Sequence, residues 1–223
     1  SAYFLFFFRM GARDLWSPDE PRYAQVAREM LRSGEWVVPH LNGEIYTEKP
    51  PLYFWLVAAL SKPFGEVSET TARLPSAISA ALVMLVTYVF GARILGRREA
   101  LLGTLVMATS AQYLWVGRIG VMDMPLALCI LTALCLFYAG YAKRFALWYM
   151  LGFLALAPAV LLKGPVGLAA PVAVMLAFLI AEIAFRQERA GRELLVFCLC
   201  ALAGLALIGL IVGPWWREAY ERS

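Results

Sequence analysis

Four acidic residues and one lysine have the types and positions that transfer chemistry needs. Asp19 and Glu20 form an acidic pair at the start of a helical segment, and Glu48 and Lys49 follow later in the same loop. Asp123 is a further carboxylate at the start of an apolar run. A carboxylate can act as a general base, and a lysine at an apolar surface can stabilise a phosphate. This set of residues indicates chemistry on a phosphorylated substrate.

The acidic pair also has a structural interpretation. Ser17, Pro18 and Glu20 fit a capping box with proline at the first helical position. The helix predicted at 18–33 has one apolar stripe and one charged face, so we expect it to lie parallel to the membrane, in the interface. The stripe consists of Tyr23, Val26, Ala27, Met30 and Leu31. Asp19 and Glu20 fall on or beside this stripe, which favours a functional role over simple solvation.

The composition indicates that lipid is the solvent of this chain. Of its 223 residues, 61% are hydrophobic and 16% are charged, and the mean hydropathy is +0.68. Soluble domains carry roughly 25% charged residues. A soluble enzyme, a disordered linker and a disulfide-rich secreted domain are therefore excluded. The net charge is only +4, and the sequence lacks the clustered basic patches of a protein that binds nucleic acid. The single histidine, His40, excludes a metal centre built from several histidines of this chain.

Six charge-free windows are long enough to cross the hydrocarbon core as helices. They run over Leu74–Ala92, Ala100–Gly117, Met124–Ala142, Phe145–Leu162, Gly164–Ala181 and Leu194–Trp216. We therefore predict an all-α polytopic membrane protein, with six transmembrane helices within residues 74–216. Residues 1–8 are interpreted as the end of a first transmembrane helix and residues 217–223 as the start of an outer loop, so we expect a truncated chain.

Residues 9–73 are predicted to form one outer loop. The apolar stretch Pro50–Ser61 would reach only about 18 Å as a helix, against a core of about 30 Å, so the helix expected at 50–63 should be re-entrant. Alternate turns carry eight basic residues against two in the intervening turns, which orients the basic turns toward the cytoplasm. The eight are Arg93, Arg97, Arg98, Lys143, Arg144, Arg186, Arg189 and Arg192, and the two are Arg118 and Lys163.

Two stretches of this loop resemble a known family. DLWSPDEPRYAQVAREMLRSGEW and PHLNGEIYTEKPPLYFWL are similar to the first outer loop of bacterial GT-C glycosyltransferases, near the aminoarabinose lipid A transferases and the dolichyl-phosphate-mannose protein mannosyltransferase-like superfamily. Further matches are Ala72-Arg73-Leu74-Pro75-Ser76, Arg118 with Asp123-Met124-Pro125, Leu162-Lys163-Gly164-Pro165 and Pro214-Trp215-Trp216. The resemblance covers nearly the whole chain and corresponds to the N-terminal half of such an enzyme.

The resemblance implies an inverting, GT-C-type membrane glycosyltransferase. It would move a sugar from a polyprenyl-phosphate donor to a lipid A-like lipid or another outer-face acceptor, with its active site on the periplasmic face of the bacterial inner membrane. Asp19 would be the catalytic carboxylate, Glu20 its supporting neighbour, and Asp123 a second acidic position. Lys49 would hold the donor phosphate. Glu48 would help to bind a divalent metal with a histidine from a second loop, so metal dependence stays open.

Four more residues complete the candidate substrate-binding set. Arg22 and Tyr23 directly follow the acidic pair, and Arg118 and Lys163 are further outer-face cations. Plainer interpretations stand beside several assignments. Lys49 can snorkel beside an apolar helix, and Lys163 can complement the carbonyls at a helix end. In the same way, Asp123 can cap a helix start.

Two other classes of protein remain as alternatives. A lipid-linked-sugar flippase would also combine helices with an interfacial basic cluster, but it should carry charges along a path across the bilayer, where the windows have none. A non-catalytic fragment that binds polyprenyl phosphate is the other alternative. Loss of turnover with retention of lipid binding on mutation of Asp19 would separate an enzyme from both.

Overall fold

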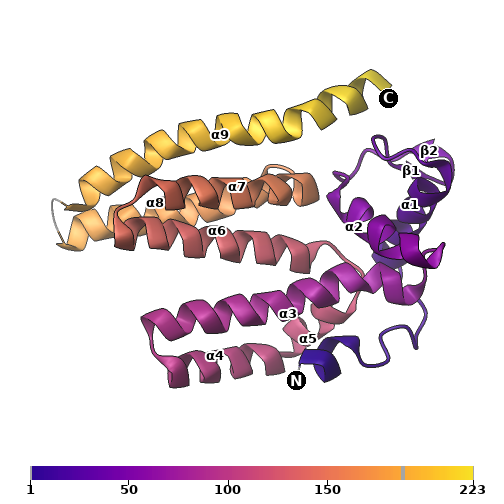
Figure 1. The fold of residues 1–223 in the computed structure, drawn as a ribbon, viewed down its shortest axis with the longest axis horizontal. Coiled ribbons are helices and arrows are strands. Elements are labelled where there is room, and N and C mark those ends of the chain that lie inside the picture. The colour runs from indigo at the N-terminus through magenta and orange to yellow at the C-terminus, as the bar shows by residue number, and fades with distance from the viewer. Residues whose placement is uncertain (1, 187–188, 223) are drawn as a thin grey trace. The chain divides into compact units, whose positions relative to one another are not determined.

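The computed structural model describes residues 2–186 and 189–222, and helices dominate it (Figure 1). Positions 1 and 223, the outer ends of the expected first-helix segment and of the expected tail, lie outside the described residues. The chain divides into two compact units, residues 1–128 with 222–223 and residues 129–221. The first unit contains η1 (Tyr3–Phe7), α1 (Asp19–Ser33), β1 (His40–Leu41), β2 (Glu44–Ile45), α2 (Leu52–Ser61), η2 (Lys62–Phe64), α3 (Glu69–Ile94), α4 (Arg97–Thr109), α5 (Ala111–Arg118) and the start of α6.

The second unit consists of the rest of α6 (Asp123–Lys143), with α7 (Ala146–Lys163), α8 (Val166–Arg186) and α9 (Arg189–Arg222). Its core is aromatic. The ring of Phe137 lies 4.9 Å from that of Phe153 and 5.2 Å from that of Phe197, measured between ring centroids. Gly152 permits this packing, because a Cβ there would lie 2.4 Å from the Phe137 ring.

Within residues 2–186 and 189–222, five helices are long and apolar enough to cross a membrane: α3, α6, α7, α8 and α9. Large apolar side chains on the helices face outward, with Val106 72% and Leu210 75% exposed. Side chains of this kind need a hydrocarbon environment, because water would penalise so extensive an apolar surface. The all-α fold and a multi-pass membrane location are thus confirmed.

The predicted span Ala100–Gly117 is wrong as a single straight helix. The structure breaks it into α4 and α5, which meet at an angle of 66°, so a sixth span exists only if the bent pair is counted as one (Figure 1). The hydroxyl of Thr109 donates to the carbonyls of Leu105 (2.9 Å) and Val106 (3.1 Å), and Ser110 is extended. Serine and threonine compete with helical hydrogen bonds in this way, which a count of charges does not detect.

The helix predicted at 18–33 is present as α1, and its apolar stripe is buried in protein. Tyr23, Val26, Ala27 and Met30 are at most 6% exposed, and α1 packs against α2 and α3. The apolar stripe therefore packs onto neighbouring helices, and the placement of α1 parallel to the membrane, in the interface, stays a prediction. The re-entrant character of α2 stays a prediction, although its ten residues span only about 15 Å.

The ends of α1 differ in how well they were predicted. The glycine stop is confirmed, since Gly34 is left-handed at φ 73° and its N–H donates to the Met30 carbonyl. The capping box is wrong. Pro18 is the N-cap, no side chain caps the helix, and the Glu20 carboxylate accepts from the N–H of Trp16 at 2.6 Å. Glu20 has a stronger partner elsewhere, as described next.

Candidate functional site

A buried ion pair between Glu20 and Arg73 organises the first unit. Arg73 Nε donates to Glu20 Oε1 at 2.7 Å and Arg73 Nη2 to Glu20 Oε2 at 2.9 Å, with both side chains at most 1% exposed. The backbone N–H groups of Trp16 and Gly120 donate to the same carboxylate. All four donors surround one glutamate, so the charge taken out of water is compensated.

Arg73 also gathers the segment that leads to α1. Its Nη1 donates to the carbonyls of Met10 (2.6 Å) and Arg13 (3.0 Å), and its Nη2 to the carbonyl of Asp14 (2.8 Å). One guanidinium thus satisfies three backbone carbonyls in addition to Glu20. The fork geometry of arginine allows this, and the single ammonium of a lysine would not reproduce it.

The pKa of Glu20 is lower than that of an ordinary glutamate. Burial alone would raise this pKa, but the hydrogen bonds from Arg73, Trp16 and Gly120 and the charge of Arg73 outweigh burial. Glu20 is therefore a carboxylate at neutral pH. Both oxygens of the Glu20 carboxylate accept hydrogen bonds. Glu20 is therefore suited to positioning its neighbours and not to taking up a proton.

The ion pair holds the two ends of the site in place. Asp19 directly precedes Glu20 in α1, and Gly120 stands three residues before Asp123, the first residue of α6. Because one carboxylate binds both Arg73 and the N–H of Gly120, the two acidic positions are tied to a common centre. Hydrogen bonds of Tyr53 and Ser76 strengthen this connection.

Tyr53 and Ser76 connect α2, α3 and the turn before α6. The Tyr53 hydroxyl donates to the Ala72 carbonyl at 3.1 Å and lies 3.3 Å from the Ser76 hydroxyl. Ser76 Oγ in turn donates to the Val121 carbonyl at 2.7 Å. The segment leading to Asp123 is thereby fixed to the interior of the unit.

The negative charges of Asp19 and Asp123 both affect the pKa of Tyr23. The Tyr23 ring is buried among Tyr53 and Phe54, with centroids 5.8 Å away in each case. Burial raises the pKa of Tyr23 first, and the negative charges of Asp19 and Asp123 raise it further. That Asp19 and Asp123 belong to one site stays a prediction.

Arg22, Tyr46 and Glu48 form the neighbouring polar group. Arg22 Nη1 lies 3.4 Å from Glu48 Oε2, and the Tyr46 hydroxyl donates to the same oxygen at 3.2 Å. Lys49 directly follows Glu48 and is half-buried. The structure thus brings Arg22 and Glu48 together at the Tyr46 hydroxyl, and the phosphate contact of Lys49 stays a prediction.

Arg118 and Lys163 lie in different surroundings. Arg118 donates through Nη1 to the Leu5 carbonyl at 2.8 Å and through Nη2 to the Phe8 carbonyl at 2.9 Å, which holds the end of η1. Lys163 ends α7 in the second unit, before Gly164 at φ 67°. Substrate binding by either residue stays a prediction.

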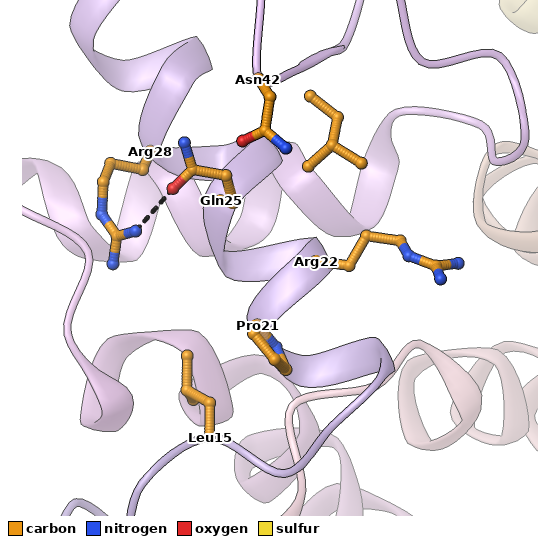
Figure 2. Close-up of a pocket in the computed structure, with 7 residues that line it drawn as sticks. Leu15, Pro21, Arg22, Gln25, Arg28 and Asn42 are labelled. Carbon is orange, nitrogen blue, oxygen red and sulfur yellow. Dashed lines mark hydrogen bonds between the residues drawn. The ribbon is translucent and has the colours of Figure 1, made fainter.

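A cavity of about 400 Å³ opens on the polar face of α1. It is lined by Leu15, Pro21, Arg22, Gln25, Arg28, Leu41 and Asn42 (Figure 2). Arg22 is the predicted site residue among them. The convergence of Asp19, Lys49 and Asp123 on a single cavity therefore stays a prediction.

The metal suggested for Glu48 finds no site in the part of the chain that the structure describes. Among residues 2–186 and 189–222, no three histidine, cysteine or acidic side chains gather in a way that could hold a metal ion. The described partners of Glu48 are Arg22 and Tyr46, which are not metal ligands of the usual kind.

Sequence reasoning missed Arg73, Gly120 and Tyr46 as site residues. Arg73 belongs to the motif Ala72-Arg73-Leu74-Pro75-Ser76 and directly precedes the charge-free window that begins at Leu74. A buried arginine at the end of a membrane span needs a partner. That signal could have identified the residue but not its partner Glu20, which lies 53 positions earlier.

The apolar helices of the described residues, with a buried polar site at one end of α3, define an all-α, multi-pass membrane protein. The profile of one family matches residues 2–221 of the sequence. The chain belongs to the dolichyl-phosphate-mannose-protein mannosyltransferase family.

Curated relatives are similar over almost the whole chain. An uncharacterised protein of Aquifex aeolicus is 33% identical over 217 residues, which cover 97% of this chain and 42% of the relative. The undecaprenyl phosphate-alpha-4-amino-4-deoxy-L-arabinose arabinosyl transferase of Edwardsiella ictaluri is 35% identical over 208 residues, covering 91% of this chain and 36% of the relative. The chain thus spans about two fifths of the length of these relatives.

Solved structures share the fold. ArnT from Cupriavidus metallidurans, in the apo state, superposes with a TM-score of 0.84 at 29% identity over 100% of this chain and 41% of its own. The structure of the same protein bound to undecaprenyl phosphate also gives 0.84, at 28% identity, covering 100% and 40%. An oligosaccharyltransferase from Archaeoglobus fulgidus matches with a TM-score of 0.71 at 16% identity over 96% of this chain and 30% of its own, which supports the fold alone.

Proposed function

We propose that the protein is a membrane glycosyltransferase that moves a sugar from a polyprenyl-phosphate donor to a lipid A-like acceptor or another acceptor on the outer face. One observation carries this proposal: the buried Glu20–Arg73 pair binds the start of α1, which carries Asp19, to the turn at Gly120, which leads to Asp123. The family membership and the arabinosyl transferase relatives support the reaction class. The binding of undecaprenyl phosphate by ArnT supports the class of donor.

The chemistry follows from the charges of these residues. An acceptor oxygen attacks the anomeric carbon of the donor, the bond from that carbon to the phosphate oxygen breaks, and polyprenyl phosphate leaves with the bonding electrons. Lys49 and Arg22 would stabilise the phosphate charge. Asp19 would take the proton of an acceptor hydroxyl. If the acceptor is a phosphate, it is already ionised, and Asp19 would orient it.

The reaction needs no nucleophile of the enzyme. A single displacement inverts the anomeric centre, and a phosphate ester is a good leaving group. The Glu20–Arg73 pair would act at a distance, by fixing the start of α1 and the turn before α6. Pre-organised positions of this kind lower the reorganisation needed in the transition state.

The proposed location is the bacterial inner membrane, with the site on the periplasmic side. The excess of arginine and lysine in alternate turns supports this orientation. A lipid-linked donor would then reach the loop of residues 9–73 from within the membrane.

The test is a transfer assay with the full-length protein in liposomes. The liposomes contain undecaprenyl phosphate-linked aminoarabinose and a lipid A acceptor, and product is measured by mass spectrometry. We expect an acceptor that is heavier by one sugar residue, together with release of undecaprenyl phosphate. Donor that crosses the bilayer without any change of the acceptor would identify a flippase and refute the proposal.

A further inference from the structure

The cavity on the polar face of α1 has the chemistry of an anion-binding site. Arg22, Gln25 and Arg28 follow one another at three-residue spacing along the helix and line one side of it. Six helical residues rise about 9 Å, so the backbone positions of Arg22 and Arg28 lie about 9 Å apart along the axis of α1. In Figure 2 the amide groups of Gln25 and Asn42 lie between the guanidinium of Arg28 on one side and that of Arg22 on the other.

No lining residue of this cavity is acidic. The nearby acid Glu29 is already occupied, because it accepts from the backbone N–H of Asn42 at 2.7 Å, from that of Gly43 at 3.1 Å and from Gln25 Nε2 at 2.7 Å. These hydrogen bonds fix the hairpin turn over the helix. Glu48 opposes one of the two cavity arginines, since it is paired with Arg22 at 3.4 Å, whereas the described partners of Arg28 are Gln25 and the Val67 carbonyl.

Arg28 is held in place but is not saturated. Its Nη1 donates to Gln25 Oε1 at 2.7 Å, and its Nη2 donates to the Val67 carbonyl at 3.2 Å. A guanidinium has five N–H donors, so further donors remain for a ligand. Asn42 is exposed and, at φ 56°, holds its amide at the tip of the turn beside the cavity.

We propose that this cavity binds a phosphate-bearing sugar headgroup of the acceptor lipid, with Arg28 and Asn42 as its specific contacts. The two cations suit a phosphate, which arginine binds through paired N–H donors. The two amides suit sugar hydroxyls, and Leu15 and Leu41 provide apolar walls. The inference rests on the proposed function, which it deepens by naming how the acceptor is recognised.

The position of the cavity agrees with an acceptor. Pro21 and Arg22 line one end of it and follow directly after Asp19 and Glu20 in α1. A headgroup anchored at Arg28 would therefore extend toward the catalytic carboxylate. Arg22, which is paired with Glu48 at 3.4 Å, would stand between the anchored headgroup and the donor phosphate.

The experiment measures binding without any donor present. The full-length protein in nanodiscs is titrated with a phosphorylated, acyl-free glucosamine disaccharide, with the same disaccharide lacking phosphate, and with inorganic phosphate. Arg28→Gln removes the charge, Arg28→Lys keeps a charge without the fork, and Asn42→Gly removes the amide while tolerating the positive φ. Arg32→Gln is the matched control, because Arg32 is exposed on the same helix and does not line the cavity.

We expect the phosphorylated disaccharide to bind at least about tenfold more tightly than either other probe, and Arg28→Gln to remove that preference, since a charge-assisted contact is lost. Arg28→Lys should retain part of it, Asn42→Gly should weaken binding several-fold, and Arg32→Gln should leave it unchanged. Equal binding of both disaccharides, binding of inorganic phosphate alone, or unchanged affinity in Arg28→Gln would overturn the proposal. Since no sugar is transferred, failure of the proposed reaction would leave these results unaffected, and the two failures are distinguishable.

Discussion

Replacing Glu20 by glutamine tests the central feature of the first unit, because the substitution keeps the shape of the side chain and removes only its charge. A glutamine presents one oxygen where the carboxylate has two. It can still accept from Arg73 Nε and the Gly120 N–H, or from Arg73 Nη2 and the Trp16 N–H, but not from all four. Two donors would then face an amide NH₂.

The size of the effect follows from these contacts. Removing one partner of a buried ion pair costs about 3–5 kcal/mol, because the other charge stays buried without compensation. Arg73 would keep its three carbonyl acceptors, so we expect the lower end of that range. About 3 kcal/mol corresponds to roughly a hundredfold change in an equilibrium constant.

Hydrogen–deuterium exchange on the full-length protein in nanodiscs measures this loss locally. The peptides that contain Trp16 and Gly120 should exchange up to about a hundredfold faster in Glu20→Gln. Glu221→Gln is the matched control, since its partner Arg217 is 82% exposed and an exposed pair contributes about 0–1 kcal/mol. Unchanged protection in both peptides of a folded Glu20→Gln protein would refute the argument that this pair organises the site.

Three further predictions follow from the same contacts. Hydrogen bonds lower the pKa of both Glu20 and Glu29 below the ordinary value of 4.5. The stability that these two carboxylates contribute is therefore complete above pH 4.5 and is lost as the pH falls through the lowered pKa values. In thermal unfolding between pH 7 and pH 3, the difference in unfolding temperature between wild type and Glu20→Gln should shrink as the pH falls. Gly120→Ala would place a Cβ 3.0 Å from the Ala72 carbonyl oxygen and 3.3 Å from Glu20 and should lower the unfolding temperature, whereas Gly103→Ala, with no neighbour within 4 Å in α4, should not. Lys49→Ala should raise the KM for the polyprenyl-phosphate donor about tenfold or more with a smaller change in kcat, because a charge-assisted phosphate contact is lost, and initial rates at varied donor will decide this.

A result against each prediction is readily stated. A constant gap between wild type and Glu20→Gln down to pH 3 would contradict the direction of the pKa shift. Equal effects of the two glycine substitutions would show that the space around Gly120 does not matter. An unchanged donor KM in Lys49→Ala would assign this lysine to snorkelling beside α2.

Local patterns predicted much of the fold. The charge-free windows gave most of the spans, because lipid tolerates few charges along a helix. Gly34 ended α1, and Asn42-Gly43 formed the tight turn, with φ of 56° and 83°. These features depend on residues that are close together in the sequence.

The remainder depends on contacts between distant residues. The sequence pattern of the α1 stripe is the same whether the stripe contacts lipid or α2. Only the tertiary structure shows that α2 covers it. In place of the predicted capping box, the Glu20 carboxylate binds Arg73, which lies 53 positions further along the chain, and the N–H of Trp16. The break at Ser110 lies beside side-chain hydrogen bonds of Thr109, which hydropathy does not record.

The candidate site was predicted in its members more than in its arrangement. Asp19, Asp123 and Arg22 came from local motifs, and their meeting in one site stays a prediction. The positioning role of Glu20 was not visible from the sequence, since a glutamate beside an aspartate carries no sign of which one is buried. Burial separates them, with Glu20 2% exposed and Asp19 half-buried.

The most direct test of the central claim is single-turnover sugar transfer by the full-length protein with Asp19→Asn, in liposomes that contain a defined polyprenyl-phosphate-linked sugar and an acceptor. Asp14→Asn is the matched control, because Asp14 is exposed and contributes only its backbone carbonyl to Arg73. We expect Asp19→Asn to lose at least about a hundredfold in transfer rate, while donor binding and the exchange protection of Gly120 stay as in wild type. A folded Asp19→Asn protein that transfers sugar at nearly the wild-type rate would contradict this expectation.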